Sequence, residues 1–385
     1  MLGLYIHVPF CKKICDYCDF RVISSNPKLF SEYSDLLCQE IEFFEKRRPG
    51  TLQTVETLYL GGGTPSILPV DQLRQIFGCL ASVGVPLKKL REVSMEFNPE
   101  STTEESIQNA RNLGVKRFSL GLQTFDGQML QRIGRSHTVE AGKRAVQLLL
   151  EHPVEVSGDL MFNLPGQSLE SFLGDVEELS SYPLNHISFY GLSVSPRTVL
   201  GQKVRRRELE INEDLYEEMY LGGVEILEKK GFARYEVSNF AKPGFESVHN
   251  RNYWERGEYI GFGPGAHSFV NNTRFYAPEM YPRWREYVRA GAKESDLTSE
   301  VLNEDDLLME LIWLSMRQSG GLSLYDVRQM GYTLKEKIVR KWEEHGYVEV
   351  SPQGADEKKI RLKGKGWIFM DDIVTDFANN CYKTK

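Results

Sequence analysis

The chain has 385 residues, of which 47 are basic and 54 are acidic, so its formal net charge is −7. Hydrophobic residues make up 41% and charged residues 26%, which is typical of globular proteins and excludes a disordered or fibrous chain. The mild acidity argues against a nucleic-acid binder, which needs a basic surface. No apolar run approaches the roughly 18 residues of a membrane span. The N-terminus lacks the basic start of a signal peptide, so we expect a cytoplasmic protein with reduced thiols.

Short runs of β-branched and aromatic residues alternate with segments of helical periodicity through the first half of the chain. The strand-like runs are 4–8, 57–60, 92–97, 117–122, 154–162 and 186–192. The helix-like segments are 30–46, 70–80, 103–113, 139–150 and 169–179. This alternation predicts βαβ units and a parallel sheet, with the chemistry-bearing residues at the carboxyl ends of the strands. The predicted fold class is α/β, a partial (β/α)6 barrel.

The second half of the chain changes character twice. A helix is expected over 214–230 and a strand over 232–238, followed by a loop-rich stretch dense in Gly, Asn, Pro and aromatic residues over 239–282. Helices are then expected over 304–317, 323–330 and 334–345, with a hairpin of 347–350 and 359–362 around a polar turn at 351–357. The predicted domains are a core barrel at 1–235, a connecting region at 236–298 and a mostly helical, winged-helix-like domain at 299–385. Basic and acidic residues nearly balance in the last, which disfavours DNA binding.

Three of the six cysteines, Cys11, Cys15 and Cys18, form a C-x3-C-x2-C cluster. In a reducing compartment such a cluster indicates metal or redox chemistry rather than disulfides. A structural zinc site needs four ligands, and His7 is the available fourth. An iron–sulfur cube held by three thiolates instead leaves one iron open to a small chelating molecule, and this is the interpretation we favour.

The segment 5–18, YIHVPFCKKICDYC, resembles the cysteine motif of the radical S-adenosylmethionine (SAM) superfamily. More specifically, it resembles the branch that includes oxygen-independent coproporphyrinogen III oxidases and the HemW family of haem chaperones. The resemblance extends over Gly61–Ser66, Phe118–Gln123, Asp159–Gly166 and the C-terminal segment. It implies a [4Fe–4S] cluster on Cys11, Cys15 and Cys18, with SAM on the fourth iron.

The same resemblance implies SAM-binding roles for further residues, each with a plainer structural alternative. The glycines of the GGGT turn at 61–64 would let the backbone come close to a ligand, or would only allow a tight turn between a strand and a helix. Arg135 would pair a carboxylate or form a surface ion pair, and Asp159 would bind ribose or an amine, or cap a helix. Tyr5 would lie near SAM or pack in the core, and Tyr17 would contact adenine. The SAM-binding set implied is Tyr5, Tyr17, Gly62, Gly63, Thr64, Glu96, Gln123, Arg135, Asp159 and Gly191.

Two departures separate the chain from the oxidases and favour the HemW family. The oxidases carry a fourth cysteine two residues after the third, where this chain has Phe20. They also have an N-terminal arm ahead of the cluster, for which Cys11 leaves no room. A positive feature is the sequence HNRNYW at 249–254, which matches the H-N-x-x-Y-W pattern associated with haem. His249 would then be an axial ligand, or would tie loop backbone together; His267 is a second candidate, which family analogy places near SAM.

We therefore expect a cytoplasmic haem chaperone that binds haem, a [4Fe–4S] cluster and SAM and delivers haem to recipient haemoproteins. Cluster-dependent homodimerisation is also expected from the family. One alternative is a radical SAM oxidase that decarboxylates the propionates of coproporphyrinogen III. Another is a zinc-stabilised interaction protein. Whether the chain cleaves SAM is left open.

Overall fold

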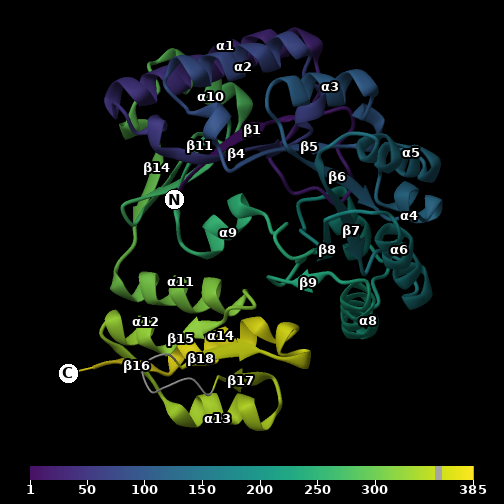
Figure 1. Cartoon of the computed structure of the whole chain (residues 1–385), viewed down its shortest axis with the longest axis vertical. Helices are drawn as coiled ribbons and strands as arrows, with labels where there is room; N and C mark the ends of the chain where they lie inside the picture. The colour runs from purple at the N-terminus through teal and green to yellow at the C-terminus, as the bar shows by residue number, and fades with distance from the viewer. Residues whose placement is uncertain (352–357, 385) are drawn as a thin grey trace.

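A computed structural model of the chain describes residues 1–351 and 358–384, and the predicted turn residues 352–357 lie outside it. Six parallel strands form the centre of a twelve-stranded sheet, which confirms the predicted partial barrel (Figure 1). Their order β1-β4-β5-β6-β7-β8 follows the chain. Their bounds are β1 Leu2–Val8, β4 Val55–Gly62, β5 Glu92–Phe97, β6 Arg117–Gln123, β7 Glu155–Phe162 and β8 His186–Gly191.

Helices connect these strands and cover the outer side of the curved sheet (Figure 1). Several begin at side-chain caps, such as Asn26 before α1 and Thr103 before α3, which satisfy N–H groups that the first turn leaves free. The core lies between the helices and the apolar side chains on the outer face of the strands. The helices are α1 Pro27–Arg47, α2 Val70–Ser82, α3 Glu104–Asn112, α4 Gly127–Arg132, α5 Val139–Leu150, α6 Leu169–Ser181, α7 Val199–Arg205 and α8 Tyr216–Lys229.

The connecting region contains short strands, which extend the sheet at both of its edges. β11 pairs in parallel with β1, and β12, β13 and β14 follow it antiparallel, while β10 and β9 flank β8. These strands are short and interrupted by glycine, and they pair with strands distant in sequence, so local patterning gives little signal. The elements are β9 Ala233–Arg234, β10 Asn239–Ala241, α9 Val248–Trp254, β11 Glu258–Phe262, β12 His267–Val270, β13 Thr273–Tyr276, α10 Tyr281–Arg289 and β14 Thr298–Val301.

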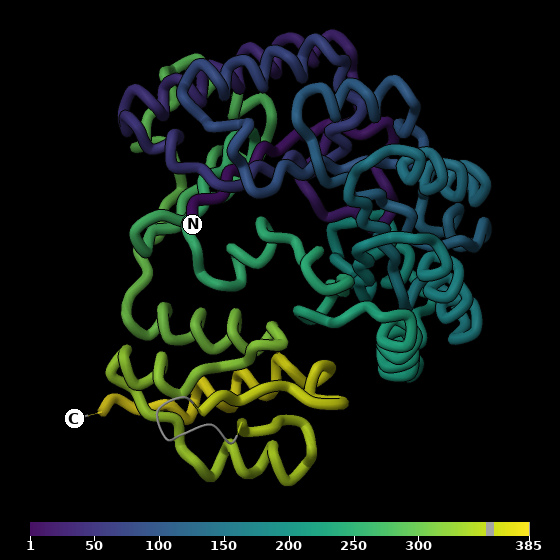
Figure 2. The backbone as a smooth tube through the Cα atoms, viewed as in Figure 1, coloured from purple at the N-terminus to yellow at the C-terminus, as the bar shows by residue number. Residues whose placement is uncertain are grey.

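The chain then enters a separate C-terminal region, seen in light green to yellow in Figure 2. It contains the three expected helices, a fourth helix that the sequence did not predict, and the β17–β18 hairpin. Arg317 joins it to the core by donating to buried Glu236 and by covering the Trp254 ring, 3.9 Å from the ring centre. The elements are α11 Glu304–Met316, β15 Leu322–Ser323, α12 Leu324–Gln329, β16 Tyr332–Leu334, α13 Glu336–Glu344, β17 Val348–Val350, β18 Lys359–Leu362, α14 Met370–Asn379 and β19 Cys381–Lys383. Among the described residues, no helix is long and apolar enough to cross a membrane.

Candidate functional site

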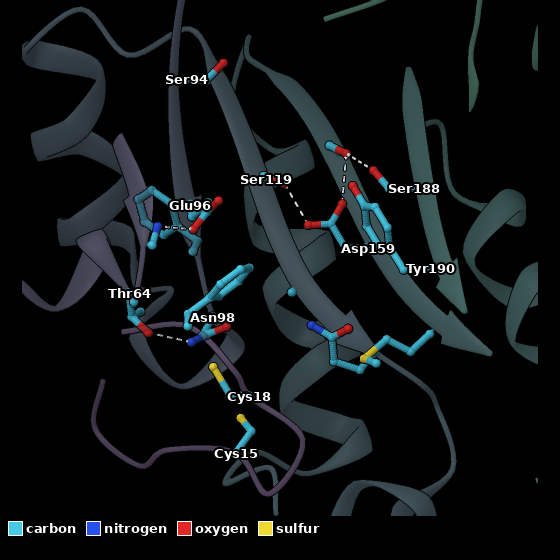
Figure 3. Close-up of a pocket in the computed structure, with 18 of the residues that line it drawn as sticks. Cys15, Cys18, Thr64, Ser94, Glu96, Asn98, Ser119, Asp159, Ser188 and Tyr190 are labelled. Atoms are coloured by element: carbon cyan, nitrogen blue, oxygen red, sulfur yellow. Dashed lines mark hydrogen bonds between the residues drawn. The ribbon is translucent and has the colours of Figure 1, made fainter. Parts of the chain in front are cut away.

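A cavity of about 370 Å³ lies inside the partial barrel. Successive side chains of a strand point to opposite faces, so every second residue of a strand faces the cavity. On β7 these are Ser157, Asp159 and Met161, while Val156 and Leu160 face the helices. Figure 3 shows Cys15 and Cys18 at one end of the cavity and Ser94, Asp159 and Ser188 toward the other. The cavity therefore has a cysteine end and a floor deeper in the barrel.

The cysteine loop brings all three predicted ligands to this cavity. Cys11 ends the two-residue strand β2 (Phe10–Cys11), which pairs with β3 (Ile23–Ser24), and Cys15 and Cys18 follow in the loop between them. The Thr64 hydroxyl donates to the Cys11 sulfur at 3.7 Å, and Arg135 Nη1 donates to the Cys15 sulfur at 3.6 Å. Burial raises the pKa of the Cys11 thiol to about 12, so metal binding at this thiol would release a proton. Two of the three thiols thus accept a hydrogen bond from a neighbouring side chain. Three such thiols match the thiolate ligands of an iron–sulfur cube.

His7, the fourth ligand considered for zinc, is not directed at these sulfurs. Its ring nitrogens lie 3.1 Å from the Tyr5 hydroxyl oxygen and 3.2 Å from the Arg21 carbonyl oxygen, and it lines a second cavity. Among the described residues, no three His, Cys, Asp or Glu side chains are grouped so as to hold a single metal ion. With His7 bonded elsewhere, the loop offers three thiols, the number that an iron–sulfur cube with one open iron takes from the protein.

The GGGT turn packs directly against the cysteine loop. Gly63 N–H donates to the Val8 carbonyl oxygen, and Thr64 N–H to that of Phe10, each at 2.7 Å. A Cβ on Gly63 would lie 2.5 Å from the Phe10 carbonyl oxygen, and Gly62 has a φ of +106°. Only glycine permits this approach and this backbone conformation without strain. The turn therefore fixes the position of the cysteine loop and also lines the cavity.

Two half-buried carboxylates face the cavity without an ion-pair partner among the described side chains. Glu96 accepts from the Tyr59 hydroxyl at 2.9 Å and the Gly62 N–H at 3.0 Å, and burial raises its pKa to about 7. Asp159 accepts from the Ser119 hydroxyl at 2.7 Å, and burial raises its pKa as well. A carboxylate of this kind is stabilised by a cationic ligand, and SAM carries an ammonium and a sulfonium group.

Arg135 supplies the opposite charge near the cysteines. Its guanidinium donates to Asn98 Oδ1 at 2.8 Å and to the Gly121 carbonyl, and it forms no ion pair within the described part of the chain. The surface ion pair considered for it is therefore absent there. Its Nε is buried without a hydrogen-bond partner, which is the kind of donor that an anionic ligand such as a carboxylate would satisfy.

Two further predicted residues reach the same cavity. Gln123 ends β6 with a φ of +73°, a strained conformation for a residue other than glycine, and its neighbours on β6 shift register at this point. Tyr17 lies inside the cysteine loop and packs against the small apolar cluster that includes Met129 and Met161. Cavity-lining residues from the predicted set are Cys11, Cys15, Tyr17, Cys18, Gly62, Gly63, Thr64, Glu96, Gln123, Arg135 and Asp159.

Three predicted residues lie elsewhere. Tyr5 lines the second cavity, beside His7. Gly191 is out of phase with the cavity-facing residues of β8, and a Cβ there would lie 2.7 Å from the Tyr216 ring. Its small size is thus explained by helix packing rather than by a ligand. His249 is 1% exposed and lies outside both cavities.

The HNRNYW segment forms the short helix α9, which is anchored to the core. Glu92 accepts from the Ser247 hydroxyl at 3.0 Å and from the Val248 N–H at 2.6 Å. The His249 ring lies 2.8 Å from the Thr57 hydroxyl oxygen through Nδ1 and 2.8 Å from the Tyr253 hydroxyl oxygen through Nε2. Burial lowers its pKa to about 4, so the imidazole is neutral. With both nitrogens hydrogen-bonded within the chain, His249 joins α9 to β4 through Thr57.

The floor of the cavity contains functional groups that the sequence did not single out. Hydroxyls there follow the alternation of the strands, and buried Arg117 has one Nη without a hydrogen-bond partner. Polar residues at every second position of otherwise apolar strands were the available signal. The floor residues are Ser94, Arg117, Ser119, Ser157, His186, Ser188, Tyr190 and Asn239.

Comparison with known proteins identifies the family and the fold. Residues 5–179 match the radical SAM superfamily. The heme chaperone HemW of Lactococcus lactis is 35% identical over 320 residues, covering 83% of this chain and 82% of that protein. HemW of Bacillus subtilis is 34% identical over 329 residues, covering 84% and 85%. Escherichia coli coproporphyrinogen III oxidase has the same fold, with a TM-score of 0.82 and 20% identity over 98% of this chain and 90% of that one.

The fold and the cysteine cavity are thus those of a radical SAM protein, a superfamily whose members typically carry a [4Fe–4S] cluster and SAM. Within that superfamily the chain belongs to the HemW family of haem chaperones.

Proposed function

We propose that this protein is a haem-binding chaperone that carries a [4Fe–4S] cluster and SAM and passes haem to recipient haemoproteins. The observation that carries the proposal is identity of about a third with bacterial HemW proteins over more than four fifths of the chain. The reduced thiols that the cluster needs favour the cytoplasm as the compartment. A dimer that forms with the cluster is part of the same proposal.

The three cysteines of the loop would hold the cluster, and its open iron would supply a site for SAM. Around it, Glu96 would bind the ammonium group and Arg135 the carboxylate of the methionine moiety, because both face the cavity, neither has an ion-pair partner among the described residues, and Arg135 Nε is unbonded. Gly62 and Gly63 would let backbone come close to the ligand. Asp159 and Gln123 would bind the remaining polar groups.

Phe20 favours the chaperone over the oxidase. It lines the cysteine cavity and is 70% exposed, so an apolar ring stands where the oxidases carry a fourth thiol. A phenyl ring can pack against a porphyrin but cannot donate, ligate or take part in redox chemistry. The shared fold with the E. coli oxidase is compatible with either function.

Anaerobic reconstitution followed by two parallel assays tests the proposal. Reconstituted protein should hold one [4Fe–4S] per chain and bind haem, and it should form no vinyl product from coproporphyrinogen III with SAM and reductant. Cys15→Ala should abolish the cluster, whereas Cys38→Ala, at a buried cysteine outside both cavities, should leave it intact. Repeated turnover of coproporphyrinogen, or the absence of haem binding, would refute the chaperone.

A further inference from the structure

A second cavity, of about 520 Å³, adjoins the cysteine cavity. The two share Phe20, Gly62 and Glu96 as lining residues. Its volume lies in the range of roughly 300–1,000 Å³ that small-molecule sites occupy. It is bounded by the barrel strand β1 and, outside the six central strands, by β11, β12 and helix α9.

One wall of this cavity presents an imidazole that is available for bonding. His267 is exposed at the start of β12, and its ring stacks on Tyr276 at 4.5 Å between ring centres. Neither of its ring nitrogens has a hydrogen-bond partner among the described residues. Partial desolvation of its ring by the surrounding cavity wall lowers its pKa, which favours the neutral form that ligates metal. Four other histidines of the chain have both ring nitrogens engaged: His7, His152, His186 and His249.

We propose that the second cavity is the haem site and that His267, rather than His249, is the axial ligand of the haem iron. This inference rests on the proposed function, since it assumes that the chain binds haem. It assigns the metal to the one cavity-lining histidine whose nitrogens are free within the described structure. It also assigns a flat ligand to a cavity that lies beside the cysteine cavity.

The walls of the second cavity suit the faces of a porphyrin. Tyr253 and Tyr259 stand edge to face at 4.7 Å between ring centres, and Phe20 leaves most of its ring uncovered. Aromatic rings that lose this exposed area on binding contribute apolar contact and stacking. The exposure of Phe20, unexplained by packing within the protein, is accounted for by a ligand that covers it.

The HNRNYW motif acquires a positioning role in this arrangement. The His249 ring is held by Thr57 and bonds to the Tyr253 hydroxyl, and Tyr253 forms part of the cavity wall. Loss of the imidazole would free Tyr253 to move without removing the axial ligand. The motif would therefore affect haem affinity by holding Tyr253 in the cavity wall, and not by ligating the haem iron.

The rim of the cavity offers two cations for the two propionates of haem. Arg21 pairs with Glu279 at 2.8 Å and Arg197 with Asp19 at 3.3 Å, and all four side chains are at least 40% exposed. Exposed ion pairs contribute only about 0–1 kcal/mol, so either arginine can exchange its carboxylate for a propionate at small cost.

Titration of the reconstituted, full-length protein with haemin tests the assignment by absorption spectroscopy. His267→Ala should shift the Soret band and weaken binding by at least roughly tenfold, and added imidazole should restore the band position. His249→Ala should weaken binding but keep the wild-type Soret position. His345→Ala is the matched control, because His345 is exposed on the C-terminal domain outside both cavities, and it should change neither.

A second variant guards against misfolding, and the outcomes separate the two proposals. The Arg21→Gln, Arg197→Gln double variant should weaken haem binding without moving the Soret band, with the cluster spectrum unchanged in every variant. If the wild type binds haem and His267→Ala behaves like the wild type, the assignment of the axial ligand is wrong. If His249→Ala alone loses the band, it is likewise wrong. If the wild type binds no haem, the proposed function itself fails.

Discussion

Replacing Glu96 by glutamine should stabilise the protein free of SAM, and only at neutral and alkaline pH. The folded protein raises the pKa of Glu96 from 4.5 to about 7, chiefly by burial. The folded state therefore holds this proton more tightly than the unfolded chain does. The free energy of unfolding then falls as the pH rises from about 4.5 to about 7 and stays lowered above it.

The size of the effect follows from the same shift. One pKa unit corresponds to about 1.4 kcal/mol, so the ionised carboxylate destabilises the fold by about 3 kcal/mol above pH 7. Glutamine carries no charge at any pH, and its carboxamide can still accept the Gly62 N–H while the Tyr59 hydroxyl turns to accept from it. We expect Glu96→Gln to match the wild type near pH 4.5 and to exceed it by up to about 3 kcal/mol at pH 8.

Glu40→Gln is a control with matched electrostatics but no contact with the cysteine cavity. Burial raises the pKa of Glu40 to about 7 as well, and its carboxylate accepts from the Gly263 N–H and the Trp284 indole. Both variants should show the same pH-dependent stabilisation in urea unfolding. Only Glu96→Gln should weaken SAM binding, measured by calorimetry on the cluster-loaded protein. A stability difference between Glu96→Gln and the wild type that is independent of pH would refute the argument.

Two structural predictions follow from the packing of the core and of the C-terminal region. Gly63→Ala places a Cβ against the Phe10 carbonyl and should lower the free energy of unfolding by about 1–3 kcal/mol, whereas Gly78→Ala, on an open face of α2, should raise it by about 0.5–1 kcal/mol; thermal denaturation compares them. Arg317→Ala leaves the carboxylate of fully buried Glu236 without its cation and should cost about 3–5 kcal/mol, with faster proteolysis between the core and the C-terminal region. Arg340→Ala, at an exposed pair, should change stability by less than about 0.5 kcal/mol, and an equal loss in both arginine variants would contradict this account.

The barrel and the cysteine loop were predictable because their signals are local. Each central strand is a short segment between segments of helical periodicity, and 92–97 has the same bounds in the sequence prediction and in the structure. The spacing of Cys11, Cys15 and Cys18 is likewise evident within one short segment of the sequence. The carboxyl-end rule then placed Glu96, Gln123 and Asp159 at one cavity, and the structure brings them there.

The position of Gly191 also follows from a local pattern. His186, Ser188 and Tyr190 line the cavity, so the alternation of a strand sends residue 191 to the opposite face, against Tyr216. The parity of each strand was available in the sequence, and with one cavity-facing residue fixed it would have predicted the floor hydroxyls as well.

Tertiary structure alone decided which histidine is free. From the sequence, His249 and His267 are both candidates for a haem ligand. In the structure, His249 is hydrogen-bonded to Thr57, which lies 192 residues away along the chain. The pairing of β11 with β1 likewise joins segments more than 250 residues apart and creates the second cavity. The sequence by itself determined the chain's periodicity, its metal-binding residue types and its turns, since these depend on neighbouring residues. Whether a given polar side chain is already bonded depends on contacts between distant segments, which only the folded chain makes.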